Sequence, residues 1–260
     1  RAIAPHIKDK FTDPAVVSVD ESGRFVIPLL SGHVGGANTL ALQVAALTGG
    51  QAAVSTATDV NGLFAVDVWA RERDMVITDR VLAKEVSAAL LEGKPVGFTS
   101  DFNHSCPVGL TESRAELGVW VTWKTGGGPF PRTLRLCPKG LILGVGCRKG
   151  TPMEAIQAAA EAALAGYEPK AVAQVATIDL KEKEPGLLAF CQAHDLPLTV
   201  FSAEELAKAE GDFTPSAFVR EITGVDNVCE RAAVRAGGML LVRKQAKNGV
   251  TVAVAGRKIP

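Results

Sequence analysis

The feature of this sequence that most constrains its fold is the alternation of short apolar runs with segments of helical periodicity. Short apolar runs bounded by turn residues are typical of buried strands, and apolar residues three and four apart are typical of amphipathic helices. We therefore expect strands over residues 25–30, 52–55, 95–99, 116–123, 140–145, 171–178, 198–201, 239–244 and 250–255, and helices over residues 37–47, 63–71, 79–91, 152–164, 186–194, 202–209 and 225–236. The pair Asn248-Gly249 between the last two strands predicts a hairpin turn. Strands that alternate with helices form βα units, so the sequence predicts an α/β fold.

The stretch KTGGGPFPRT, residues 124–133, interrupts this alternation. Gly and Pro break regular elements and are common in the connections between domains. The alternation restarts after this stretch. We therefore expect two α/β domains, over residues 1–125 and 139–260, each with a mostly parallel sheet flanked by helices, and a linker over residues 126–138.

Composition and charge exclude several classes of partner. The chain has 260 residues, of which 47% are hydrophobic, and its 28 basic residues balance 28 acidic ones. Zero net charge disfavours binding to nucleic acid or to an anionic membrane surface, and no apolar run is long enough to cross a membrane. Five cysteines without a CxxC pair favour neither disulfides nor structural zinc, so we expect a cytoplasmic protein. The start, RAIAPHIKDKF without an initiator Met, suggests that the native protein extends further upstream.

The first candidate site is the stretch LLSGHVGGAN, where the first strand gives way to a helix. Ligands of parallel α/β sheets bind beyond the carboxyl ends of strands, glycines let a ligand approach the backbone, and a helix N-terminus favours anions. His33 adds a group that donates, accepts or titrates near neutral pH. The other candidate binding residues are Ser31, Gly32, Gly35, Gly36 and Asn38. The alternative is a tight turn in which His33 caps or packs. The stretch is neither GxGxxG nor a P-loop, so no nucleotide is implied.

The stretch TATDVNG occupies the same position after the second strand, so two polar loops are expected to border one crevice. Asp59 can orient or deprotonate His33, or act as the general base itself. Thr58 and Asn61 are candidate substrate contacts, and Asn61 can donate to a carbonyl or to a developing oxyanion. The alternative is that Asp59 or Asn61 caps the helix that follows.

The stretch GVGCRKGTPMEA follows the first strand of the second half and is the sharpest local signal. Thr151 and Glu154 fit a capping box, with Pro at the first helical position. Arg148 and Lys149 lie just before this helix, and cations beside glycines and a helix N-terminus favour a carboxylate or phosphate. Cys147 and Thr151 complete the candidate site. Two alternatives remain: Glu154 itself uses a helix donor, or the neighbouring cations lower the pKa of Cys147.

Three polar residues elsewhere have weaker claims to a function. His104 and Cys106 lie together after a strand, but two ligands do not make a metal site, so a polar loop is the favoured interpretation. Glu230 lies on the helix predicted over residues 225–236, where the sequence leaves open whether it faces the crevice or solvent.

Taken in order, these blocks resemble a known family. The segments FVIPLLSGHVGGANTLA, STATDVNGLFAVDVWA and LLEGKPVGF, followed by LILGVGCRKGTPMEAI, ATIDLKEKEPGLLAF and GVDNVCERAAV, are similar to the cobalt-precorrin-5A hydrolase family, called CbiG, of the anaerobic cobalamin pathway. The resemblance covers nearly the whole chain, and the second half is similar to the smaller stand-alone CobE family. Full-length members have extra sequence before the position of Arg1.

The resemblance implies a reaction on a cobalt-containing corrinoid. Water opens the ring-A lactone of cobalt-precorrin-5A, and the bridging carbon leaves with its methyl as acetaldehyde, which gives cobalt-precorrin-5B. Cobalt comes with the substrate, so no cofactor and no protein-bound metal are expected. The corrinoid is the expected partner, without nucleic acid or membrane, and a homodimer is left open.

We assign roles within the matching blocks from this chemistry. His33 is expected to be the acid/base, assisted by Asp59, while Arg148 and Lys149 anchor substrate carboxylates. The glycine turns of the two domains are expected to face one cleft. Two other functions stay open: a carrier that binds a corrinoid without catalysis, and an enzyme acting on another anionic metabolite such as a sugar phosphate.

Overall fold

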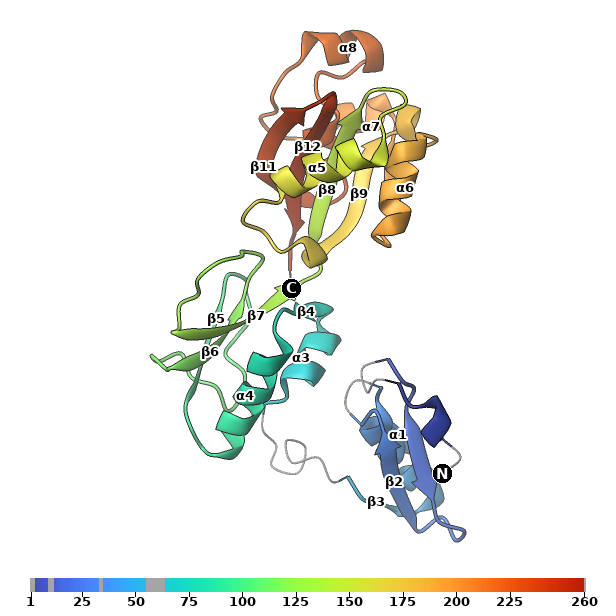
Figure 1. Cartoon of the computed structure of the whole chain (residues 1–260), viewed down its shortest axis with the longest axis vertical. Coiled ribbons are helices and arrows are strands. Elements are labelled where there is room, and N and C mark those ends of the chain that lie inside the picture. Colours follow the sequence, from blue (N-terminus) through green and yellow to red (C-terminus); the bar gives the residue numbers. More distant parts are fainter. Residues whose placement is uncertain (1–2, 9–11, 33–34, 55–63, 260) are drawn as a thin grey trace. The chain divides into compact units, whose positions relative to one another are not determined.

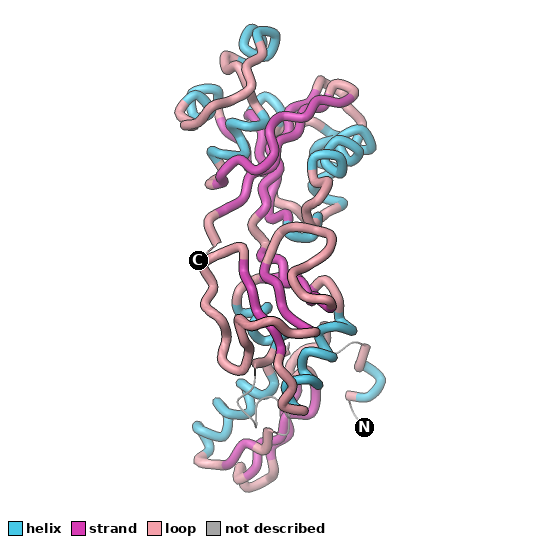
Figure 2. Tube along the Cα trace, turned by 90° about the vertical axis from the view of Figure 1, so that its left-hand side faces the viewer, coloured by secondary structure: helices cyan, strands magenta, loops and turns pink. Residues whose placement is uncertain are grey.

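The computed structural model describes residues 3–8, 12–32, 35–54 and 64–259. The chain is α/β, as predicted, and the described residues form three separate sheets (Figures 1 and 2). The chain divides into two compact units: residues 1–101, 105–120 and 128–136 form the first, and residues 102–104, 121–127 and 137–260 form the second. The domain limits predicted at residues 125 and 139 stay a prediction.

The first sheet lies near the start of the chain and has the order β1-β2-β3. It is made of β1 (Val16–Val19), β2 (Phe25–Leu30) and β3 (Gln51–Ala52), with β1 antiparallel and β3 parallel to β2. Helix α1 (Ala37–Thr48) joins β2 to β3 and ends at Gly49 in the left-handed conformation, as the Gly49-Gly50 pair predicts. Ala41 and Ala45 of α1 pack on Val26 of β2, so a small core positions the turn that links them. A 3₁₀ turn (Ala4–His6) precedes the sheet.

The second sheet has the order β4-β7-β6-β5 and uses strands from distant parts of the chain. Its elements are α3 (Val66–Glu72), β4 (Met75–Ile77), α4 (Arg80–Leu91), β5 (Val96–Ser100), β6 (Leu117–Val121) and β7 (Arg132–Pro138). The ring of Phe130 fills the places where side chains at Gly97 and Gly118 would stand, which explains both glycines.

Strand β7 corrects the expectation of a linker over residues 126–138. The second half of that stretch is an internal strand of the second sheet, with Leu134 and Leu136 fully buried. The Gly and Pro residues at the start of the stretch made all of it resemble a linker. Composition indicates local flexibility, but it does not show whether the residues that follow pair with another strand.

The third sheet has five strands in the order β10-β9-β8-β12-β11. They are β8 (Leu141–Cys147), β9 (Val172–Ile178), β10 (Leu198–Phe201), β11 (Gly238–Lys247) and β12 (Val250–Arg257). Strands β8, β9 and β10 are parallel, and the antiparallel β11–β12 hairpin extends the sheet from β8. The turn at Asn248-Gly249 has positive φ at both residues, which confirms the predicted hairpin.

Helices cover both faces of this third sheet. Helices α7 (Ala203–Ala207) and α9 (Cys229–Arg235) pack on Ile142, Ala176 and Ala255 at one face, while α5 (Met153–Ala163) and α6 (Pro185–Ala193) lie together over the face turned forward in Figure 1. The short helix α8 (Ala217–Thr223) lies where no helix was predicted, and 3₁₀ turns cover Pro169–Ala171 and Asp179–Lys181.

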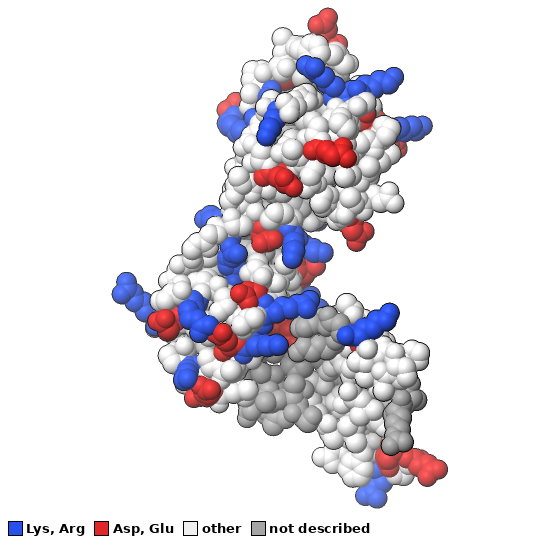
Figure 3. Space-filling view, in the orientation of Figure 1, with Lys and Arg blue, Asp and Glu red and all other residues white. Residues whose placement is uncertain are grey.

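No helix among the described residues is long and apolar enough to cross a membrane. Basic and acidic side chains are interspersed on the face shown in Figure 3, as the balanced composition predicts.

Candidate functional site

The first candidate site is the turn between β2 and α1. Gly36, with φ +83°, is the N-cap of α1, and open space surrounds the position where its side chain would begin. The N–H of Ala37 donates to the carbonyl of Ser31 (3.1 Å), and the N–H of Asn38 donates to the carbonyl of Gly32 (3.0 Å). The turn therefore satisfies two of the first helix donors itself, which leaves fewer for a ligand than the sequence suggested.

Close packing explains the other two glycines of this turn. A side chain at Gly35 would overlap Ser31, and one at Gly32 would come within 2.8 Å of Oδ1 of Asn38. Ser31 and Asn38 are both buried. These four predicted residues are thus brought together in one compact turn, with glycines where the backbone has no room for a side chain.

Four of the predicted residues lie outside the described part of the chain: His33, Thr58, Asp59 and Asn61. Strands β2 and β3 are parallel, but their pairing covers only Phe25 with Gln51 and Val26 with Ala52, so β3 ends four residues before β2 reaches Leu30. The His33–Asp59 pair itself stays a prediction.

The second candidate site is the loop between β8 and α5. The N–H of Arg148 donates to the carbonyl of Gly249 (3.2 Å), so the tip of the β11–β12 hairpin supports this loop. The side chains of Arg148 and Lys149 are exposed, and neither is in an ion pair or a side-chain hydrogen bond within the described residues. Both cations are therefore available to an anion from solvent.

The capping box predicted here is wrong. Pro152 is the N-cap of α5 and has no side-chain cap, while Oγ1 of Thr151 donates to the carbonyl of Arg148 (2.8 Å). Thr151 thus closes the loop instead of capping the helix, because its hydroxyl finds a nearer acceptor one turn earlier in the chain.

A carboxylate of the protein occupies the anion position that the sequence assigned to a ligand. The N–H of Gly150 donates to Oε1 of Glu184 (2.6 Å), and Nζ of Lys181 lies 3.1 Å from Oε2. Burial by itself would raise the pKa of Glu184, but the bond from Gly150, the contacts of Lys181 and the charge of Lys149 together hold this pKa below its ordinary value. Glu184 is therefore a buried, ionised group that ties the loop after β9 to the loop after β8.

Glu184 was missed in the sequence, although a signal for it was present. The carboxyl ends of the parallel strands β8 and β9 lie side by side, so residues 148–152 and 179–184 were bound to meet at one edge of the sheet. The sequence suggested Glu154 as an internal competitor for the helix donors. The structure gives a contact of this kind to Glu184 from the neighbouring loop.

Cys147 is not an activated thiol. Burial raises the pKa of Cys147 most strongly; the charge of Lys181 lowers it, Glu184 raises it again, and a hydrogen bond with Thr151 lowers it slightly. The net shift is upward, which contradicts the alternative in which neighbouring cations lower it. Within the described residues no group of three His, Cys, Asp or Glu side chains is arranged to hold a metal ion, and no disulfide joins any of the five cysteines.

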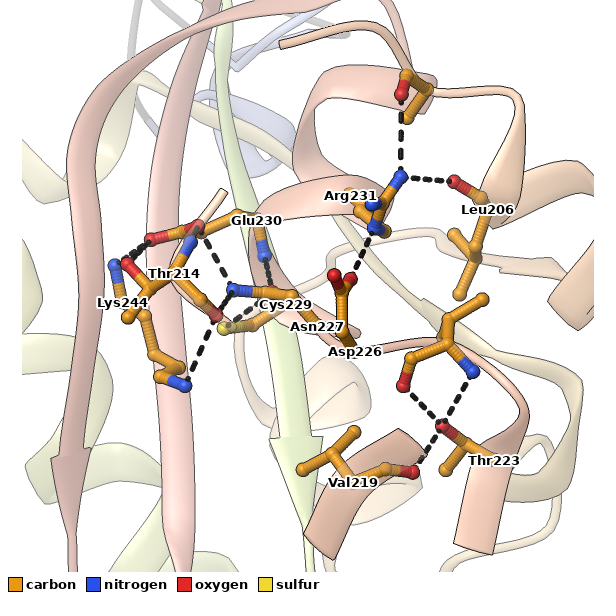
Figure 4. A network of polar contacts seen from close by, with 12 residues as sticks. Leu206, Thr214, Val219, Thr223, Asp226, Asn227, Cys229, Glu230, Arg231 and Lys244 are labelled. Atoms are coloured by element: carbon orange, nitrogen blue, oxygen red, sulfur yellow. Dashed lines mark hydrogen bonds and ion pairs between the residues drawn. The ribbon is translucent and has the colours of Figure 1, made fainter. Parts of the chain in front are cut away.

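Glu230 is fully buried and faces neither a crevice nor solvent (Figure 4). Its carboxylate accepts hydrogen bonds from the N–H of Thr214 (2.7 Å) and its Oγ1 (2.9 Å), from Nδ2 of Asn227 (2.9 Å) and from the N–H of Lys244 (2.6 Å). These bonds join α9, β11 and the loop before α8, so Glu230 has a structural role.

Comparison with known proteins gives matches along the whole chain. Three family models match successive segments: Cobalamin synthesis G N-terminal over residues 1–59, Cobalamin biosynthesis central region over residues 64–138, and Cobalamin synthesis G C-terminus over residues 141–255.

Individual relatives carry related names. A cobalt-precorrin-5A hydrolase of Salmonella typhimurium is 33% identical over 271 residues, which cover 97% of this chain and 77% of the relative. A second protein of that name, from Priestia megaterium, is 31% identical over 281 residues, covering 98% of this chain and 75% of the relative. Protein CobE of a Sinorhizobium species is 38% identical over 123 residues, covering 45% of this chain and 80% of that protein.

Proposed function

The chain belongs to the cobalt-precorrin-5A hydrolase family, and from this we propose that it opens the ring-A lactone of cobalt-precorrin-5A and releases acetaldehyde, giving cobalt-precorrin-5B in anaerobic cobalamin biosynthesis. One observation carries the proposal: 97% of this chain aligns at 33% identity with a protein of that name. Cobalt is part of the substrate, and we propose that the protein holds no cofactor of its own.

The reaction needs two proton transfers at the lactone. A base first deprotonates the water that attacks the lactone carbonyl, and this attack leaves a carboxylate and a free hydroxyl on the carbon that was bridged. A base then takes the hydroxyl proton as the carbon–carbon bond breaks, acetaldehyde departs, and the electron pair of that bond passes into the macrocycle. We assign these transfers to His33 with Asp59.

The carboxylates on the rim of the substrate need cationic partners, and we assign these to Arg148 and Lys149. Their side chains are exposed and are in no ion pair within the described residues. Because Glu184 already accepts the N–H of Gly150, the anchoring is expected to come from the two side chains and not from the loop backbone. Cys147 and Thr151 shape the loop that presents them.

Release of acetaldehyde distinguishes an enzyme from a protein that only binds the corrinoid. Purified protein is incubated with cobalt-precorrin-5A, and acetaldehyde is followed by reduction with alcohol dehydrogenase and NADH. Turnover of many equivalents is the expected result, and His33→Ala is expected to abolish it while the corrinoid still binds. Stoichiometric binding without acetaldehyde would instead identify a carrier, and absence of any change in the corrinoid spectrum would favour a different anionic substrate.

The proposal also concerns the cellular location, the partner and the oligomeric state of the protein. We propose a cytoplasmic location, since all five cysteines lie among the described residues and none is in a disulfide. The corrinoid is the proposed partner, and a homodimer remains to be tested by sedimentation.

A further inference from the structure

Ser31 is the residue that follows β2, and its hydroxyl is buried without a hydrogen bond from or to any described residue. The side chain is buried, with an exposed fraction of 6%, and Oγ has no hydrogen-bond partner within the described part of the chain. Among the described residues it is the one buried side-chain nitrogen or oxygen without a partner. Buried hydroxyls of native proteins nearly always have one, so this atom calls for an explanation.

The backbone at Ser31 is also unusual. Its φ of +56° lies in the left-handed region, which a residue with a side chain adopts at a cost. The conformation directs the carbonyl of Ser31 to the N–H of Ala37, and the side chain packs on Gly35, where no other residue type would fit. A glycine would adopt this conformation more easily than the serine that is present.

The two features together point to a ligand. The left-handed φ and the unsatisfied hydroxyl both raise the free energy of the unliganded protein. A ligand that accepts a hydrogen bond from Oγ would offset part of this cost. The partner would meet the N-terminal end of α1, a helix of 12 residues, where the helix dipole favours negative charge.

We propose that the hydroxyl of Ser31 donates a hydrogen bond to a carboxylate oxygen on the rim of the bound corrinoid. This inference rests on the proposed function and deepens it, because it gives the β2–α1 turn one specific contact with the substrate. Because the side chain is buried against Gly35, this contact requires the hydroxyl to turn toward the ligand as it docks. Ser31 is a binding residue in this account and takes no part in proton transfer.

Two variants and two corrinoids test the proposal. Ser31→Ala removes the hydroxyl, and Ser31→Gly also relieves the backbone. Cobyrinic acid, whose rim carries carboxylates, is titrated against each protein and followed by its visible spectrum; cobinamide, whose rim carries amides, serves as the uncharged comparison. Thermal unfolding of each unliganded protein is measured in parallel.

The Ser31 variants are expected to keep or gain thermal stability and to lose affinity for the ligand. Ser31→Ala and Ser31→Gly are expected to unfold at the same temperature as the wild type or higher, while their Kd for cobyrinic acid rises about tenfold, the loss of one hydrogen bond to a charged group. The loss is expected to be smaller for cobinamide. Ser87→Ala is the control, since Oγ of Ser87 has a partner, the carbonyl of Ala83 (3.2 Å), and its removal should leave Kd unchanged.

Three results would overturn the inference. A lower unfolding temperature for Ser31→Ala would show that the hydroxyl stabilises the unliganded fold. An unchanged Kd for cobyrinic acid would show that Ser31 does not contact the ligand, and an equal rise of the Kd for cobinamide would show that the contact is not to a carboxylate. In each of these cases the wild type still binds and turns over its corrinoid, so the proposed function stands. A wild type that neither binds cobyrinic acid nor releases acetaldehyde defeats both.

Discussion

Among single residues, Glu184 contributes most clearly to the arrangement of the second site. Its side chain is 6% exposed, and that of its partner Lys181 is 17% exposed. An ammonium group that loses its partner in such surroundings stays partly buried without compensation, which costs more than the pair itself contributes. Glu184 and Lys181 therefore act as one unit that fixes the loop after β8.

Replacing Glu184 by Gln is expected to lower the free energy of unfolding by about 1–3 kcal/mol, because Lys181 loses its counter-charge and the bond from Gly150 weakens. Urea denaturation followed by circular dichroism measures this difference. Glu182→Gln is the matched control, since Glu182 is exposed in the same loop, and it should change stability by no more than about 0.5 kcal/mol. Equal stability of the two variants would show that the pair contributes little.

The same carboxylate predicts a dependence on pH. The pKa of Glu184 is lower in the folded chain than its ordinary value of 4.5, so its contribution is complete above pH 4.5 and is lost as pH falls through the folded value. The stability difference between wild type and Glu184→Gln should therefore shrink as pH is lowered from about 7 to about 3. Urea midpoints across this range measure it, and a difference that grows toward acid would contradict the sign.

At the scale of elements, the approach of α9 to the third sheet depends on one glycine. A Cβ at Gly144 of β8 would overlap the carbonyl oxygen of Cys229 at the start of α9. Because that oxygen belongs to the backbone, the helix itself would have to move. Helix α9 also carries Glu230, so a shift would disturb the bonds of that carboxylate to Thr214 and Lys244.

Gly144→Ala is accordingly expected to lower the free energy of unfolding by about 3 kcal/mol, at the upper end of the range for overpacked positions. Gly127→Ala provides the comparison, since nothing lies within 4 Å of the added carbon there, and its effect should be close to zero. Chemical denaturation of both proteins measures the effect. A neutral Gly144→Ala would mean that α9 adjusts without cost.

Elements with strong local signals were predictable, and contacts between elements were not. Helix α1, strands β8 and β9 and the hairpin at Asn248-Gly249 follow from periodicity and turn residues alone. Strand β7 did not, since one of its two neighbours is β4, and Thr78 just after β4 lies 57 residues before Arg135 of β7. Thr151 was assigned to a cap because a competing acceptor is invisible in a local motif. The basic pair at Arg148 and Lys149 could be predicted from a local motif, whereas Glu184 was missed because its signal lies in the adjacency of β8 and β9 and not in any one stretch.

For the molecule as a whole, the balance of 28 basic and 28 acidic residues means that attraction of an anionic substrate cannot come from net charge. It has to come from local groups, and Arg148 and Lys149 form an exposed basic pair beside Gly150. Local attraction of this kind is screened by salt beyond about 8 Å at physiological ionic strength.

The double variant Arg148→Gln, Lys149→Gln is expected to raise the Kd for cobyrinic acid about tenfold, which is about 1.4 kcal/mol, and to flatten the dependence of Kd on salt. Spectral titration at two salt concentrations measures both effects. Lys183→Gln, an exposed cation in the loop after β9, is the control and should leave both unchanged. An unaltered salt dependence in the double variant would place the anchoring groups elsewhere.

The position of β4 at the edge of the second sheet affects how the nascent chain folds during translation. The N–H and hydroxyl of Thr78, just after β4, both donate to the carbonyl of Arg135 on β7, 57 residues later. A ribosome that adds about 5–20 residues per second takes roughly 3–11 s to cover that distance. Throughout this interval β4 lacks its neighbour in the sheet, so this segment is where we expect a chaperone to be needed during translation.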